Sequence, residues 1–213
     1  MNAPDLSVLN LPSLIVFAAL AIMSVLAVTV TFYKTFQFNR LGVGQFNAAE
    51  AILGTWLGGQ AEDAVRHAGE QRFVLGRVLQ SVFSGLRAKP GMPDFAAELG
   101  RQTAMTELSR LSRRMRVLEV IVQGAPMLGL LGTVIGMIDA FSTLAAADGT
   151  VDPTLLASGI WTALTTTAAG LAIALITYFA ATWLEGRIEG ERQAMETLIS
   201  AAIHGRVDSE AAG

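Results

Sequence analysis

The chain of 213 residues is 52% hydrophobic and 15% charged, with a mean hydropathy of +0.49, which is too apolar for an ordinary soluble domain and indicates a membrane protein. It has no cysteine, which excludes disulfides and thiolate metal sites, and its two histidines, His67 and His204, lie far apart in polar segments. We therefore expect no metal and no cofactor. The net charge of −3 gives no indication of a nucleic acid partner.

Three apolar segments are long enough to cross a bilayer, which takes about 20 residues in a helix. These segments are 11–33, 117–147 and 155–184. No Lys or Arg precedes the first, and no Ala-x-Ala site closes it, so it is not expected to be a cleaved signal peptide. The other two exceed the hydrocarbon core in length and should tilt or continue into water as helix. Asp152 and Pro153 predict the start of the third helix.

The basic residues predict the orientation of the chain. All 15 Lys and Arg lie between the first and second segments or after the third. Since basic segments stay in the cytoplasm, residues 34–116 and the C-terminal helix and tail, 185–213, are expected inside. The N-terminal segment 1–10 and the turn 148–154 are expected in the periplasm. Four arginines next to the second segment are expected to anchor it at the lipid headgroups: Arg110, Arg113, Arg114 and Arg116.

The cytoplasmic region 34–116 is predicted to be helical. Apolar residues recur at helical spacing in 62–88, and the Pro- and Gly-containing stretch 89–94 predicts a reversal between two helices. The helical spacing that resumes at Phe95 continues into the second apolar segment with no stop signal, which predicts one long helix. Several glycines in 41–60 predict a broken or short helix there.

The second apolar segment carries more small residues than solubility in lipid requires. Gly132 and Gly136 have G-x-x-x-G spacing, which lets two helix backbones approach closely, between or within subunits. The residues expected to serve helix packing are Pro126, Gly129, Gly132, Gly136 and Gly170. Thr133 has two interpretations: a hydroxyl bonded to a carbonyl one turn earlier, or a polar step on an ion pathway.

The third apolar segment carries an unusual run of hydroxyl groups. On a helical wheel, one face holds Ser158, Thr162, Thr165 and Thr166, while Thr167 falls nearly opposite. One set can therefore face a neighbouring helix and the other a lumen, and the wheel leaves open which. Phosphate-loop, zinc-protease and nucleophile-elbow motifs are absent from the sequence, so we do not expect an enzyme.

Residues 125–141 and 159–171 resemble the paired signatures of the MotA/TolQ/ExbB proton-channel family. Three spans and a short chain are more similar to ExbB and TolQ than to MotA. The resemblance implies an all-α integral membrane protein that forms a pore as a homo-oligomer, a pentamer whose second and third helices line the lumen. It also implies a single-span partner of the ExbD or TolR type in the pore, whose aspartate carries the proton, and a TonB- or TolA-like transducer.

Two positions depart from the resemblance. Thr162 stands where many ExbB and TolQ proteins have glutamate, and Ile176 stands where they have proline. The spans then hold only Glu119 and Asp139 as charged groups, both near predicted ends, which leaves the partner's aspartate as the expected carrier. Thr133 and Thr167 match the pore threonines of the family. From this match and from position in the spans, the residues expected on the ion pathway are Thr133, Thr167, Thr162, Thr166 and Asp139.

The function expected from these features is a proton-channel subunit of an inner-membrane motor that energises a TonB-like protein for outer-membrane transport. One alternative is a TolQ-like subunit for envelope maintenance and division. A second is a membrane scaffold that conducts nothing. A small-solute transporter is disfavoured, because three spans without an internal repeat make no alternating-access pair.

Overall fold

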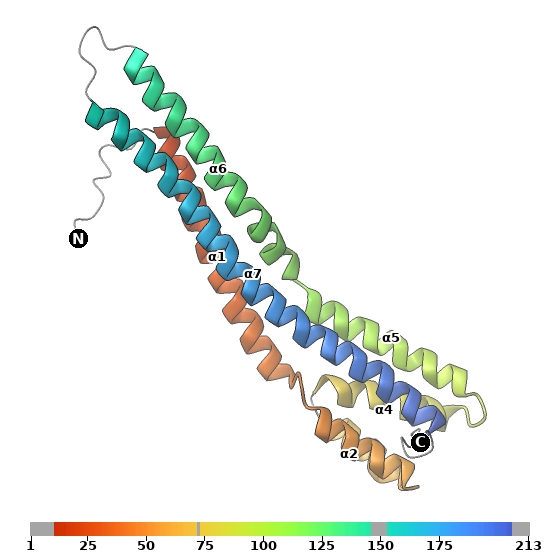
Figure 1. The fold of residues 1–213 in the computed structure, drawn as a ribbon. Coiled ribbons are helices and arrows are strands. Elements are labelled where there is room, and N and C mark those ends of the chain that lie inside the picture. Colours follow the sequence, from red (N-terminus) through yellow and green to blue (C-terminus); the bar gives the residue numbers. More distant parts are fainter. Residues whose placement is uncertain (1–10, 72, 146–152, 206–213) are drawn as a thin grey trace, which may run out of the picture. The chain divides into compact units, whose positions relative to one another are not determined.

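The computed structural model describes residues 11–71, 73–145 and 153–205, and within these ranges the regular structure is entirely helical (Figure 1). The helices are α1 (Leu11–Leu41), α2 (Phe46–Leu57), α3 (Ala61–Glu70), α4 (Val74–Ala88), α5 (Pro93–Ser112), α6 (Met115–Ala145) and α7 (Pro153–His204). The predicted all-α fold is confirmed. The expectations for 1–10, the Asp152 cap, most of the 148–154 turn and the tail after residue 205 lie outside the described residues.

Three helical runs, containing α1, α6 and α7, are long and apolar enough to cross a membrane, as predicted. Their apolar side chains are widely exposed, as for Ile22 and Val25 of α1 and Leu171 of α7. Such exposure is expected of side chains that face lipid or another helix. The α7 helix also continues as helix past the third apolar segment to His204, so it is longer than a span of the hydrocarbon core requires.

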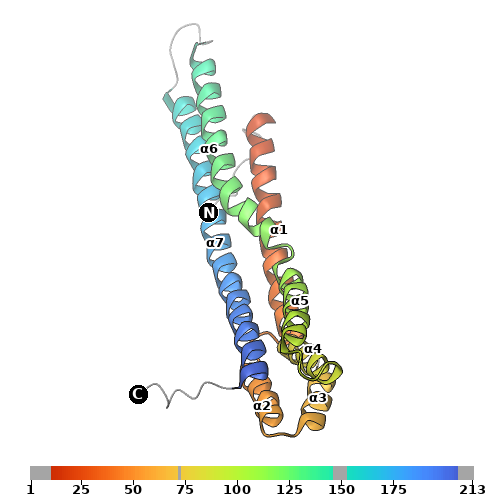
Figure 2. The ribbon, with the colours of Figure 1, turned by 90° about the vertical axis from the view of Figure 1, so that its right-hand side faces the viewer.

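The chain forms two compact units, of which the first contains residues up to Phe32 and residues 114–182. Here the apolar part of α1 packs with α6 and the first part of α7, which run side by side in both views (Figures 1 and 2). Its buried core is made of small and branched side chains: Val16, Leu20, Ala27, Ile121, Ala125 and Ala174. These small residues bring the three helices close together.

The second unit contains residues 33–113 and those from 183 onward. The reversal predicted at 89–94 is confirmed, because α4 ends at Ala88 and α5 begins at Pro93 and packs back on it. The apolar residues predicted on α4 are buried, including Leu79 and Phe83. Trp56 of α2 stacks on Phe83 with ring centroids 4.2 Å apart, and its indole N–H donates to the Ala202 carbonyl of α7 at 3.3 Å.

The single long helix predicted to run from Phe95 into the second apolar segment is wrong. The α5 helix ends at Ser112 and α6 begins at Met115, with Arg114 at a φ of +73° between them. Near the end of α5, the carbonyl of Leu111 accepts a hydrogen bond of 2.6 Å from the buried ammonium of Lys34. The end of the helix is therefore stabilised by a cation, which favours the negative end of a helix dipole.

The segment 62–88 is likewise two helices, because α3 ends at Glu70 and α4 begins at Val74. Gln71 and Phe73 between them have extended backbone. The broken helix predicted for 41–60 is confirmed: a turn at 42–45 precedes α2, and Gly42 and Gly44 in this turn both have positive φ.

Candidate functional site

The strip of small residues on α6 packs against α7 within one subunit. A Cβ added to Gly136 would lie 2.8 Å from Cβ of Ala163, and one added to Gly132 would lie 2.5 Å from the Thr166 hydroxyl. The contact is reciprocal, because a Cβ on Gly170 of α7 would meet the carbonyl oxygen of Ala125. Real side chains do not approach this closely, so only glycine permits the two backbones to touch. The sequence left open whether this contact lies within or between subunits, and here it lies within.

Two neighbouring threonines of α7 converge on one carbonyl of α6. The Thr166 hydroxyl lies 3.2 Å from the Gly129 carbonyl oxygen and 2.6 Å from that of Ala163, and the Thr167 hydroxyl donates to Gly129 at 2.9 Å. Thr166 is 1% exposed, whereas Thr167 is only partly buried. Both threonines therefore tie α7 to α6, and Thr167 keeps part of its surface accessible.

The other hydroxyl groups of α7 lie away from this contact. Thr165 is exposed and donates to the Trp161 carbonyl at 2.8 Å, and the partly exposed Thr162 donates to Ser158 at 3.0 Å. The helical wheel placed Thr166 on the same face as these residues, but the structure separates them. Thr166 is buried against α6, whereas Ser158 and Thr165 are exposed and Thr162 is partly exposed. Thr166 lies at the edge of their sector, and α6 packs on that edge.

Thr133 lies on a part of α6 that α7 does not cover. Its hydroxyl donates to the Leu130 carbonyl at 2.6 Å, which confirms the bond expected one turn earlier. The side chain is also partly exposed and contributes the hydroxyl to a shallow hollow otherwise lined by Val134, Met137, Ile138 and Phe141. Because the hydroxyl donates its one proton to the backbone, its oxygen offers lone pairs to that hollow.

Two further expected residues lie on α6. Asp139 is partly exposed near the end of the helix, where its carbonyl accepts hydrogen bonds from Ser142 and Thr143 at 2.9 and 3.0 Å. Pro126 lies inside α6, directly after Ala125, whose carbonyl faces Gly170. Among the residues that the structure describes, no group of three His, Cys, Asp or Glu side chains is placed to hold a metal ion.

A sequence model described as the MotA/TolQ/ExbB proton channel family matches residues 70–197, more than half of the chain. This chain belongs to that family. The match includes α6 and the part of α7 that packs on it, and thus both halves of the contact described above. Within the family the chain is most similar to ExbB, and the three apolar helices make it a membrane-embedded protein.

Three curated relatives carry ExbB names. A putative biopolymer transport protein ExbB-like 1 from Synechocystis is 32% identical over 165 residues, or 76% of this chain and 63% of the relative. A putative ExbB homolog from Methanothermobacter thermautotrophicus is 33% identical over 141 residues, 66% of this chain and 48% of the relative. Biopolymer transport protein exbB1 of Vibrio cholerae is 34% identical over 116 residues, 54% of this chain and 50% of the relative. The chain thus spans about half to two thirds of their lengths.

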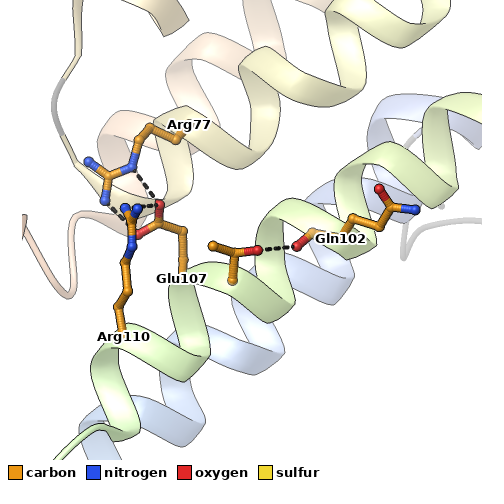
Figure 3. A network of polar contacts seen from close by, with 5 residues as sticks. Arg77, Gln102, Glu107 and Arg110 are labelled. Atoms are coloured by element: carbon orange, nitrogen blue, oxygen red, sulfur yellow. Dashed lines mark hydrogen bonds and ion pairs between the residues drawn. The ribbon is translucent and has the colours of Figure 1, made fainter.

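The four arginines expected at the headgroups are all exposed in this ExbB-like chain, and Arg110 takes part in an ion network of the second unit. Arg110 donates to Glu107 at 3.2 Å, and Arg77 of α4 donates to both oxygens of Glu107, at 3.1 and 2.7 Å (Figure 3). Glu107 is only 4% exposed, so this ion network joins α4 to α5 in a partly dry site. Arg113 follows the end of α5, where its N–H donates to the Ser109 carbonyl.

Sequence reasoning missed three buried charged residues of the second unit: Lys34, Glu107 and Glu191. In the sequence, Lys34 counts only among the basic residues that predict the orientation of the chain. A signal for Glu107 was present, because it lies between Ala104 and Leu111 on the buried stripe of α5. Glu191 likewise lies at helical spacing from the buried Leu184, Met195 and Leu198, which indicates that it is on the buried face of α7.

Proposed function

We propose that this chain is the proton-channel subunit of a motor that is driven by the proton-motive force and energises a TonB-like protein. In this proposal it acts as a homo-oligomer, expected to be a pentamer, around an ExbD- or TolR-like single-span partner. One observation carries the proposal: the family match covers both the partly accessible Thr167 hydroxyl in the α6–α7 contact and the Thr133 hydroxyl on the part of α6 that α7 leaves uncovered.

The proposed topology follows from charge. The N-terminus and the 148–154 turn lie in the periplasm, residues 34–116 and 185–213 lie in the cytoplasm, and the membrane is the bacterial inner membrane. The spans are 11–33, 117–147 and 155–184, within α1, α6 and α7. The positive-inside rule supports this orientation, because every Lys and Arg falls in the two segments assigned to the cytoplasm.

The hydroxyl groups suit a pathway for a proton carried on a carboxyl group. Thr133 and Thr167 each donate to a backbone carbonyl, which leaves the oxygen lone pairs as acceptors. A protonated carboxylic acid of a partner has an O–H to donate, and a water molecule does as well. Neutral acceptors hold either one without burying a charge. Thr162 and Asp139 are proposed to extend the pathway, whereas Thr166, buried against α6, is assigned to packing.

Thr133→Val and Thr167→Val test this proposal, since valine keeps the shape and removes only the hydroxyl. Each change is expected to abolish or strongly reduce uptake through an outer-membrane receptor that depends on the proton-motive force. The oligomer and its co-purified partner should be unchanged. Thr166→Val is the matched control, because it removes the other hydroxyl bonded to Gly129 and should act on stability alone.

Thr165→Val serves as a second control, since its exposed hydroxyl bonds within α7 and should be nearly silent. Full activity of the double variant T133V/T167V would reject the assignment and favour a scaffold that conducts nothing. A larger loss at Thr165 than at Thr167 would show that the other side of α7 lines the pore.

A further inference from the structure

In the second unit, α7 holds the turn between α1 and α2 by the two polar ends of a single peptide group, the one that joins Val43 to Gly44. The Glu191 carboxylate accepts a hydrogen bond from the Gly44 N–H, and the Arg187 guanidinium donates to the Val43 carbonyl at 3.0 Å. Arg187 and Glu191 are one helical turn apart, so they form a fork on one face of α7. Gly44 has a φ of +94°, and a Cβ there would lie 3.0 Å from the Arg187 guanidinium, so glycine is the residue that fits this position.

The carboxyl group of Glu191 has only part of its hydrogen-bonding capacity filled. Glu191 is fully buried, and one of its two carboxyl oxygens, Oε2, has no hydrogen-bond partner within the described part of the chain. The turn at 42–45 and the first residue of α2, Phe46, include no titratable side chain. Arg187 is the charged group whose field acts on this carboxyl. A buried carboxylate with one oxygen unpaired is costly, whereas a protonated carboxyl avoids most of that cost.

The geometry points to a proton-binding site at Glu191 that acts as a latch: the protonated carboxyl keeps the α1–α2 turn seated on α7, and loss of its proton to water releases the turn. This site is separate from the threonine pathway and goes beyond the proposed channel function. Arg187 is the second positioning residue of the latch, because its bond to Val43 does not depend on the charge of Glu191.

The direction of the pH dependence follows from burial. Burial raises the pKa of the Glu191 carboxyl above its ordinary value, and the Gly44 N–H and the Arg187 charge lower it by less. The latched state therefore binds the proton more tightly than an open glutamate. The latch is at full strength below the ordinary pKa of glutamate and weakens as the pH rises through the raised pKa. In the proposed topology the controlling pH is that of the cytoplasm.

Hydrogen exchange of the purified, full-length oligomer tests the latch. The rate at residues 42–46 is measured by mass spectrometry at several pH values from 5 to 8.5, in the wild type and in Glu191→Gln. Dividing the two rates at each pH cancels the intrinsic pH dependence of amide exchange. The wild-type rate relative to the variant should rise by up to about tenfold for each pH unit between the open and latched pKa values of Glu191.

Glu189→Gln is the matched control, because Glu189 is exposed on the same helix and bonds to Arg192 and Gln193. Its ratio to wild type should stay at one. Glu191→Met, which resembles the neutral acid in size and lacks its charge, should reproduce the pH-independent exchange of Glu191→Gln and guards against an effect of the amide itself. A ratio of wild type to Glu191→Gln that is constant with pH, or a ratio of wild type to Glu189→Gln that rises with pH by the same amount, would overturn the latch.

Discussion

Gly129→Ala is the sharpest test of the contact between α6 and α7. A Cβ at this position would lie 2.8 Å from the Thr166 carbonyl oxygen and 3.0 Å from Cα of Thr167. Both are backbone atoms of α7, so no side-chain rotation relieves the clash and the helices must separate. Gly124→Ala on the same helix is the matched control, because its Cβ would meet only the terminal methyl of Met23 at 3.1 Å, which can move.

The expected magnitude combines three effects. Overpacking of a tight contact costs about 1–3 kcal/mol. Separation also stretches the two threonine bonds to the Gly129 carbonyl, and interhelical bonds in membranes average about 0.6 kcal/mol each. The better helix propensity of alanine returns about 1 kcal/mol in both variants. Gly129→Ala should therefore unfold with a free energy about 2–4 kcal/mol below that of Gly124→Ala.

The assay is reversible unfolding in mixed detergent micelles with increasing dodecyl sulfate, followed by circular dichroism or tryptophan fluorescence. Because the variants differ only in which glycine is replaced, their difference isolates the contact. Equal stability of the two variants would refute the reasoning, since it would mean that α6 and α7 are not in backbone contact at Gly129.

Three further predictions concern the second unit and the topology. Glu107→Gln should destabilise the protein by about 1–3 kcal/mol in the same assay, because two arginines lose their charged acceptor, whereas Glu98→Gln on the exposed side of α5 should be neutral. Trp56→Phe should cost about 0.5–1.5 kcal/mol, because it loses the bond to Ala202 but keeps the stack on Phe83; a loss as large as that of Trp56→Ala would contradict this. Because the chain has no cysteine, single cysteines report the topology. In cells with a permeabilised outer membrane, a membrane-impermeant thiol reagent should label Gly149→Cys, a position outside the described residues, and should label Ala88→Cys only after lysis. The reverse pattern would invert the topology.

The helices that cross the membrane were predictable because apolar length is a strong signal, and the small residues of α6 correctly predicted a close helix contact. The end of α5 was not predictable from the same pattern. Leu111 and Met115 are four residues apart, so the apolar spacing continues across the turn at Arg113 and Arg114. What accompanies the break is a long-range bond, from Lys34 to the Leu111 carbonyl, and no local pattern contains it.

The same limit applies to the threonines of α7. A helical wheel places Thr166 about 80° from Ser158 and about 100° from Thr167, so it can group with either. The choice depends on where α6 packs, and Gly129, Gly132 and Gly136 fix that direction. The sequence thus shows that this part of α7 is rich in hydroxyl groups, but the packing of α6 decides which hydroxyl is buried.

In the proposed function, the hydroxyl groups of α6 and α7 combine solubility in lipid with a polar path. Thr133, Thr162 and Thr167 all donate to backbone carbonyls, so none of them brings an unsatisfied donor into the bilayer. The same bonds orient the oxygens as acceptors and remove them as proton donors. A row of fixed acceptors stabilises a protonated carrier but does not itself release protons. This division of labour supports the proposal that the acid which loads and unloads the proton is contributed by the partner helix.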